Sequence, residues 1–110
     1  MRTDHNKLVR DRIPEIIAAS GRRCAVEEMD AAAYRQALLD KLVEEAREAQ
    51  EAAAAGSSET LLSELADLRE AIAAAMAAFG LREEQLTEAR HRRREERGAF
   101  TRRLRLLWTE

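Results

Sequence analysis

The chain has 110 residues, of which 45% are hydrophobic and 36% are charged, so it is long enough for one domain with a modest core. Only 4% of the residues are aromatic and alanine supplies much of the apolar content, so the core must be built by elements that approach closely. The single cysteine, Cys24, excludes an internal disulfide, and no side chains around it support a nucleophile. No signal peptide or transmembrane segment is evident, which favours a cytoplasmic protein that does not engage a membrane.

The net charge of -2 conceals a segregation of charge along the chain. Residues 1–26 carry six Lys/Arg against three Asp/Glu, residues 27–70 carry four against twelve, and residues 81–110 carry nine against six. If the basic ends fold back over the acidic middle, cations would surround an acidic centre, an arrangement that suits a metal ion bound to phosphates. Solvated faces arranged by chance would give the same charge pattern.

The first predicted elements are short. Pro14 suits the first position of a helix and Gly21 suits its end, which predicts a short helix over residues 14–19. Residues 23–27 show little periodicity and could form a brief extended segment.

Two long helices are predicted in the centre of the chain. Asp30 suits the N-cap of a helix over residues 31–55. A short turn follows, in which Ser57 or Ser58 can cap a second helix over residues 59–79. The two helices would form an antiparallel hairpin, because the connection between them is short.

The second helix is apolar or small on most of its sides. It carries a main stripe and an alanine face, formed by Leu61, Leu65, Leu68, Ile72, Met76 and Phe79, and by Ala71, Ala74, Ala75 and Ala78. Such a helix needs neighbours on both faces, which a hairpin alone does not provide. The pattern therefore predicts an all-α bundle that needs further helices or a partner subunit.

The C-terminal part is predicted to contain one more helix and an arm. The helix extends over residues 83–96 and is followed by Gly98. Leu104, Leu106 and Trp108 alternate within residues 101–108, which suggests a short strand or a docking arm.

One carboxylate of the first long helix occupies an unexpected position. At about 100° per residue, the apolar stripe lies within roughly 40° of one line and includes Tyr34, Leu38, Leu42, Ala49 and Ala52. Glu45 falls inside this stripe. A charge on the face that the helix must bury calls for a cationic partner.

Further carboxylates are spaced so that they can join Glu45. Glu44, Glu45 and Glu48 share one patch of the first long helix, and Glu64 and Asp67 share one patch of the second. In an antiparallel hairpin the two patches lie at nearly the same height. Converging carboxylates repel one another unless a cation lies among them, and ligands that are all oxygen suit Mg²⁺ before Mn²⁺ or Ca²⁺.

A solvated charged face and a di-iron site are the two alternatives to a magnesium site for these acids. The run EEAREAQEA could be a solvated face with local Glu–Arg pairs, although the stripe position of Glu45 argues against this. A di-iron bundle would require two Glu-x-x-His motifs, and His5 and His91 stand in no such pattern.

The motifs, taken in order, resemble a known family. EEAREAQ followed by ELAD resembles the E-E-x-x-E and E-x-x-D motifs of the all-α nucleoside triphosphate pyrophosphohydrolases, the MazG-like proteins, which include phosphoribosyl-ATP pyrophosphohydrolase. NKLVRDRIPEII and RREERGAF resemble the opening and the close of the phosphoribosyl-ATP pyrophosphohydrolase-like branch. These motifs are spread over nearly the whole chain, so the resemblance implies a single domain over residues 1–110.

The resemblance implies a fold, an activity and roles for the carboxylates. The fold would be a bundle assembled from two chains, as a homodimer or a dimer of dimers. The activity would be hydrolysis of a nucleoside triphosphate between the α and β phosphates, to the monophosphate and pyrophosphate. The enzyme would remove surplus or non-standard nucleotides, which is a house-cleaning role. Glu45, Glu48 and Asp67 would bind Mg²⁺, while Glu44 and Glu64 would complete the site as further ligands or as the group that orients water.

The basic ends then gain a predicted use. Lys7, Arg10 and Arg12 could contact the triphosphate, with Asp11 holding one of them by an ion pair, and the C-terminal side could supply Arg93 and Arg97. A structural belt of ion pairs is an equal alternative. Two positions depart from the family pattern: Arg93 stands where lysine is usual, and Arg69 stands where an apolar residue is usual.

Two functions from other classes compete with nucleotide hydrolysis. A catalytically inactive helical oligomerisation module would use the same apolar faces and keep the acids as structure. Nucleic-acid binding through HRRREERGAFTRR is disfavoured, because glutamates interrupt the basic run and its one phenylalanine is not interleaved for base stacking.

Overall fold

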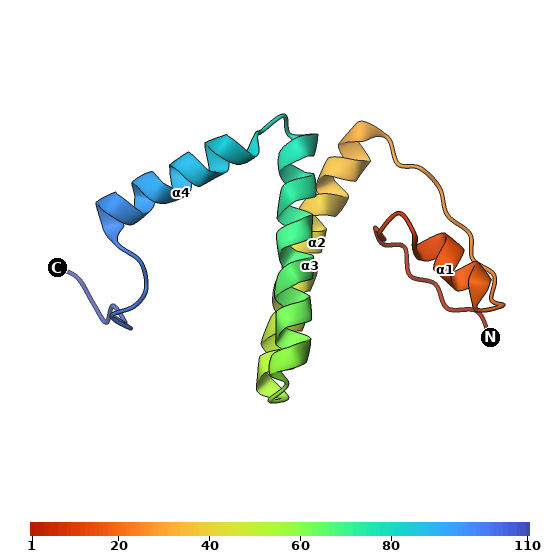
Figure 1. Ribbon diagram of the computed structural model, residues 1–110, viewed down its shortest axis with the longest axis horizontal. Helices are drawn as coiled ribbons and strands as arrows, with labels where there is room; N and C mark the ends of the chain where they lie inside the picture. Colours follow the sequence, from red (N-terminus) through yellow and green to blue (C-terminus); the bar gives the residue numbers. More distant parts are fainter. The chain divides into compact units, whose positions relative to one another are not determined.

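Residues 1–110 of the computed structural model form four α-helices and no β-strand (Figure 1). The helices are α1 (Ile13–Ala19), α2 (Ala31–Ala54), α3 (Ser58–Ala78) and α4 (Glu83–Arg97). The chain divides into two units, Met1–Gly80 and Leu81–Glu110. The predicted all-α fold is confirmed, and each helix begins and ends within one residue of its predicted bounds. None of the four has the length and apolar character of a membrane-spanning helix.

The centre of the first unit is an antiparallel hairpin of α2 and α3, which lie side by side (Figure 1). Asp30 caps α2, since its side chain accepts a hydrogen bond from the N–H of Ala33 at 2.8 Å. Gly56 turns the chain with a φ of 75°, a left-handed conformation that favours glycine. Ser57 then caps α3 by accepting a hydrogen bond from the N–H of Thr60 at 3.2 Å. These local signals fix the short connection that makes the helices antiparallel.

The buried core between the two helices is small and rich in alanine. The apolar residues that α2 and α3 bury are Leu38, Ala49, Ala52, Ala71, Ala75 and Met76. Alanine side chains let helix backbones approach closely, as the low aromatic content predicts. Glu45 is the one charged residue buried in this core.

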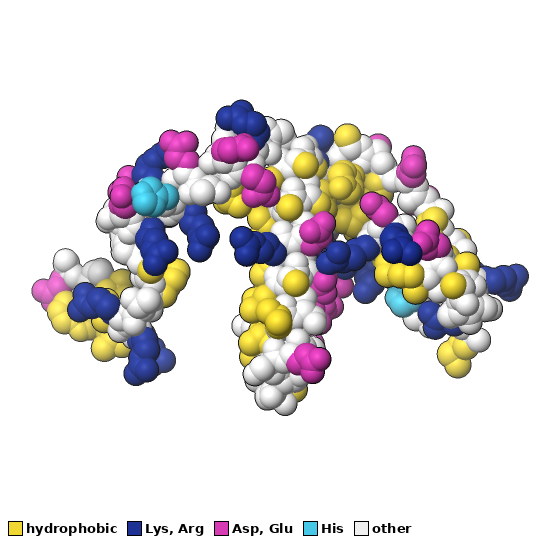
Figure 2. All heavy atoms as spheres, in the orientation of Figure 1, with side chains coloured by type: hydrophobic (Ala, Val, Ile, Leu, Met, Phe, Trp, Pro, Cys, Tyr) yellow, Lys and Arg dark blue, Asp and Glu magenta, His cyan; other side chains and the backbone are white.

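Large apolar side chains stay exposed on the outer faces of the hairpin. Leu62 and Leu65 on α3 are 69% and 47% exposed, and Leu39 and Val43 on α2 are also exposed. Figure 2 shows hydrophobic side chains along the turn end of the hairpin. As predicted, the hairpin by itself does not cover α3. The hairpin therefore presents an exposed apolar surface, and other helices are needed to bury it.

Neither of the two segments suggested as strand-like, residues 23–27 and 101–108, forms a strand. Both lack regular secondary structure, and the docking arm given as the alternative for residues 101–108 stays a prediction. The alternating Leu104, Leu106 and Trp108 are all highly exposed.

The second unit contains α4 and the residues that follow it. The side chain of Gln85 accepts a hydrogen bond from the N–H of Arg82 at 2.8 Å, which fixes the start of α4. The helix ends at Arg97 and is followed by Gly98, which has a φ of 80°. No residue of α4 is buried, and some of its charged side chains pair locally, for example Glu88 with Arg92 at 3.5 Å. α4 is thus a solvated, charged helix.

Candidate metal centre

Five carboxylates from α2 and α3 converge in the first unit. Glu44, Glu45 and Glu48 each offer an oxygen, and these three oxygens lie within 4.8 Å of one another. Glu45, Glu64 and Asp67 form a second group that meets the same limit. We call these five residues the carboxylate cluster. Glu45 belongs to both groups, so it lies at the centre of the cluster, as its position in the apolar stripe predicts.

Burial makes two oxygens of the carboxylate cluster unusual. Glu45 is only 5% exposed, because it shares a helix face with Leu38, Ala49 and Ala52. Oε2 of Glu45 and Oε2 of Glu64 are buried and have no hydrogen-bond partner. A buried carboxylate oxygen without a partner is strongly destabilising, and a cation between the two helices would offset that penalty.

The acid–base properties of the carboxylate cluster reflect its crowding. Burial raises the pKa of Glu45 above 4.5, and the negative charge of Glu48 raises it further. Hydrogen bonding to the carboxyl group of Glu64 raises the pKa of Glu48, and burial adds to this effect. Glu45 and Glu48 therefore hold protons more tightly than exposed glutamates do, which is the behaviour of acids that lack enough positive charge.

Three cations border the carboxylate cluster. Nζ of Lys7 lies 3.3 Å from Oε1 of Glu44, and Nη2 of Arg10 lies 2.6 Å from Oδ1 of Asp67. Nζ of Lys41 lies 3.4 Å from Oε2 of Glu44 and 3.5 Å from Oε1 of Glu45. Burial by itself would raise the pKa of Glu44, but Lys41 and Lys7 outweigh it and the pKa is lowered. The basic N-terminal segment thus reaches the acidic hairpin.

The remaining predicted cations have different surroundings. Asp11 is exposed and forms no ion pair, since Lys7, Arg10 and Arg12 pair with other carboxylates, and its predicted role in holding a cation stays a prediction. Arg12 pairs instead with Glu15 at 2.8 Å, since residues three apart meet on the same side of α1. Arg93 and Arg97 are exposed on α4, in the second unit, and their contact with a substrate stays a prediction.

Lys41, which is not among the predicted site residues, contacts two members of the carboxylate cluster. The sequence does indicate a contact between Lys41 and Glu45, since Lys41 precedes Glu45 by four residues and residues four apart are neighbours on a helix. Such spacings are also common on solvated faces. The burial of Glu45 is what distinguishes this pair from a surface pair.

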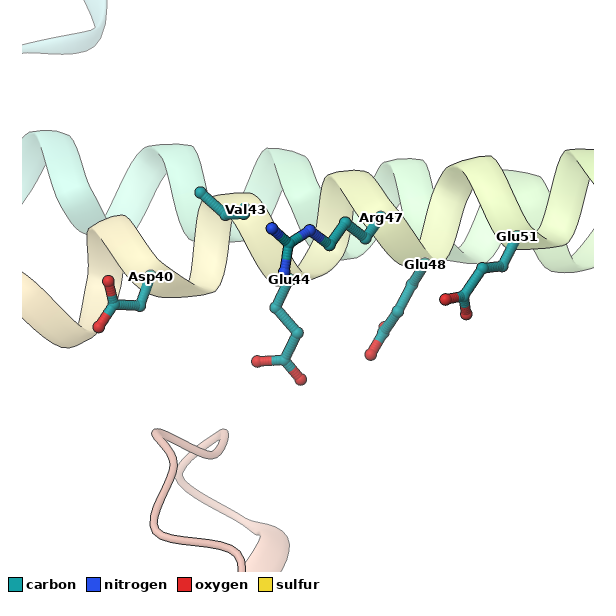
Figure 3. Close-up of a pocket in the computed structure, with 6 residues that line it drawn as sticks. All are labelled: Asp40, Val43, Glu44, Arg47, Glu48 and Glu51. Carbon is teal, nitrogen blue, oxygen red and sulfur yellow. The ribbon is translucent and has the colours of Figure 1, made fainter.

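A hollow of about 430 Å³ lies along α2 beside the carboxylate cluster. Figure 3 shows its lining, in which the carboxylates of Asp40, Glu44, Glu48 and Glu51 extend to the same side of α2. Val43 and Arg47 complete the lining. The predominance of acids gives this surface a negative potential that favours cations.

The donor set decides which kind of cation fits. Every side chain of the carboxylate cluster offers carboxylate oxygens, and no histidine or thiol belongs to it. Oxygen donors in this number suit a hard divalent ion, and the unpartnered oxygens of Glu45 and Glu64 supply places for it. The cluster can therefore bind a metal ion.

Comparisons with known proteins give one match. The sequence model of a family described as phosphoribosyl-ATP pyrophosphohydrolase matches residues 5–94. That range contains the whole carboxylate cluster, as well as Lys7, Arg10 and Arg93. Searches of the curated proteins and of the solved structures returned no match.

Proposed function

Because the chain belongs to the phosphoribosyl-ATP pyrophosphohydrolase family, we propose that it hydrolyses a nucleoside triphosphate, or a phosphoribosyl-ATP-like nucleotide, with Mg²⁺. Cleavage between the α and β phosphates would yield a monophosphate and pyrophosphate. One observation carries this proposal: two groups of carboxylates share the buried Glu45, whose Oε2 has no partner. The role we infer is house-cleaning of non-standard or surplus nucleotides in the cytoplasm.

Four carboxylates are proposed to hold the ion: Glu45, Glu48, Glu64 and Asp67. Glu45, Glu64 and Asp67 offer oxygens from two helices that lie within 4.8 Å of one another, and Glu48 meets the same limit with Glu45. When bound there, Mg²⁺, or Mn²⁺ as a substitute, would neutralise charge on the phosphates and make a nearby water more acidic. The charge repulsion that adds to the raised pKa values of Glu45 and Glu48 would be relieved at the same time.

Glu44 is proposed to act on the attacking water. Like an ordinary glutamate it is ionised at neutral pH and can accept a proton, and Lys41 and Lys7, which lower its pKa, keep it in that form. The water oxygen forms a bond to the α phosphorus as its proton passes to Glu44. The bond between the α phosphorus and the bridging oxygen breaks, and the electron pair leaves with pyrophosphate. Glu44 adjoins Glu45 and Glu48, which places this base beside the proposed ligands.

The cations of the N-terminal segment are proposed to bind the phosphate chain. Lys7 and Arg10 now pair with carboxylates, and both side chains are substantially exposed, so they can exchange these partners for phosphate oxygens. Arg93 and Arg97 are proposed to assist, and Asp11 is proposed to hold one of the N-terminal cations by an ion pair. A nucleotide would then be held between basic groups and the ion, which is the arrangement that the segregation of charge predicts.

A second copy of the chain is proposed to complete the bundle, as a homodimer or a dimer of dimers. The exposed Leu62 and Leu65 support this proposal, because apolar residues gathered on one helix are typical of an interface. Replacing Leu62 by Lys is expected to give a monomer in sedimentation equilibrium. An unchanged mass would place the interface elsewhere.

The decisive test is a screen for pyrophosphate release. Phosphoribosyl-ATP and a panel of standard and modified nucleoside triphosphates would be incubated with the protein and Mg²⁺. Release of pyrophosphate and the matching monophosphate from at least one nucleotide is the expected result. The absence of release from all of them, with Mn²⁺ as well as Mg²⁺, would favour an inactive helical interaction module.

A further inference from the structure

Lys41 differs from the other cations beside the carboxylate cluster in how firmly it is held. Its side chain is 19% exposed, whereas that of Lys7 is 47% exposed and that of Arg10 is 57% exposed. Lys41 also contacts two members of the cluster, while Lys7 and Arg10 each contact one. Lys41 is largely enclosed, and its partners Glu44 and Glu45 are only three and four residues away on the same helix. The side chain therefore has little freedom to move away from these carboxylates.

The contacts of Lys41 divide the oxygens of Glu45 into two kinds. Oε1 lies 3.5 Å from Nζ of Lys41. Oε2 is buried and has no partner. A carboxylate that is held through one oxygen keeps the other in a defined direction, which is how groups behind metal ligands orient them.

Glu44 shows a similar division. Its Oε2 lies 3.4 Å from Lys41, and its Oε1 lies 3.3 Å from Lys7. Lys7 is the more exposed partner, so a phosphate can draw it away and free Oε1. Lys41 would retain Oε2 and keep Glu44 in place during that exchange.

We propose that Lys41 is a positioning residue that holds Glu44 and Glu45 so that the free oxygen of each faces the ion or the water. This inference rests on the proposed function. It extends that function to a residue that binds neither metal nor substrate and acts through two carboxylates.

The proposal makes a prediction opposite in sign to that of simple electrostatics. A positive charge beside the carboxylate cluster repels Mg²⁺, so removing Lys41 would strengthen Mg²⁺ binding if charge alone mattered. If Lys41 orients the ligands, its removal weakens binding, because Glu44 and Glu45 must then be ordered by the ion itself. The sign of the change therefore separates the two roles.

The experiment measures the Mg²⁺ concentration that gives half of the full rise in melting temperature, together with kcat and KM. For Lys41→Met we expect that concentration to rise about tenfold and kcat to fall about tenfold or more, with KM for the nucleotide within about twofold. Lys41→Gln keeps a hydrogen-bond donor without the charge, so a smaller rise is expected. If Lys41→Met does not fold, the half-saturating Mg²⁺ concentration is measured on Lys41→Gln instead.

Arg47→Met is the matched control, since it removes one positive charge from the same helix. Arg47 is exposed and forms no ion pair, so this variant should leave the half-saturating Mg²⁺ concentration unchanged or lower it. The Lys41 proposal is overturned if the Lys41 variants leave that concentration unchanged or lower it, or if Arg47→Met raises it equally. A wild-type protein that neither responds to Mg²⁺ nor releases pyrophosphate would instead overturn the proposed function.

Discussion

Acidic side chains have different surroundings in the two units. On α4, Glu88 and Glu95 are exposed and pair with Arg92 and His91 one turn away, at 3.5 Å and 3.2 Å. In the hairpin, Glu45 is buried among apolar side chains and keeps one oxygen without a partner. α4 and α2, the helix that carries Glu45, are both rich in glutamate, so amino-acid composition does not distinguish the two kinds of surroundings.

The difference lies in where each acid finds its partner. An exposed acid on α4 is hydrated by water, and Glu88 also pairs with a cation of its own helix, so these acids need no partner from another element. The carboxylate cluster gathers five acids from two helices beside three cations, and two of its oxygens face no donor. Convergence across elements, and not the number of acids, is therefore the feature that indicates a metal site.

The largest expected effect comes from replacing the central acid. Glu45→Gln should reduce pyrophosphate release by roughly a hundredfold or more, because it removes the carboxylate common to both groups. The metal-free variant should melt at the same temperature as wild type or higher, since one repelling charge is gone. Glu51→Gln, an exposed site on the same helix, is the control and should retain activity. Full turnover by Glu45→Gln would show that the site is wrongly assigned.

Adding the ion should stabilise the folded chain. With a Kd of about 1 mM, about 10 mM Mg²⁺ should raise the melting temperature by roughly 5–10 °C. Differential scanning fluorimetry of the wild type would measure the rise, and Glu45→Gln should lose most of it. If Mg²⁺ and Mn²⁺ leave the wild type unchanged, with or without a nonhydrolysable nucleotide, the carboxylates form no metal site.

The response to Mg²⁺ should also depend on pH. The pKa values of Glu45 and Glu48 are raised above 4.5, so their protonation stabilises the metal-free fold below that pH, and this contribution is lost as the pH rises through the raised values. Protons and Mg²⁺ compete for the same oxygens. The rise in melting temperature should thus be smaller at about pH 5 than at about pH 7.5. An equal rise at both values would argue against these two ligands.

A smaller effect is expected from the N-terminal cations. Arg10→Gln breaks the 2.6 Å ion pair with Asp67, but both groups are partly exposed, so the free energy of unfolding should fall by no more than about 1 kcal/mol. If Arg10 binds the phosphate chain, KM should rise several-fold more than kcat falls. Arg2→Gln, which breaks an exposed pair with Asp4, serves as the control. Equal KM values for the two variants would leave Arg10 with a structural role alone.

The sequence was sufficient for the helices and for the burial of Glu45, because caps and helical spacing are local. Asp30 and Ser57 cap the helices as predicted, and the stripe position of Glu45 corresponds to a buried side chain. Features that depend on a partner were harder to predict. The short strand suggested at residues 101–108 does not form, since it has no neighbouring strand, and Lys41 resembles any solvated lysine until the burial of Glu45 is known.

The smallest effect is expected for the exposed acids of α4. Glu88→Gln removes the exposed ion pair with Arg92 on α4, a contact between residues four apart that contributes less than about 0.5 kcal/mol. Melting temperature, turnover and the half-saturating Mg²⁺ concentration should all stay close to the wild-type values. A clear loss of Mg²⁺ response in this variant would mean that an acid of α4 belongs to the metal site. Convergence within the hairpin would then be insufficient to explain binding, because the solvated helix would supply a ligand as well.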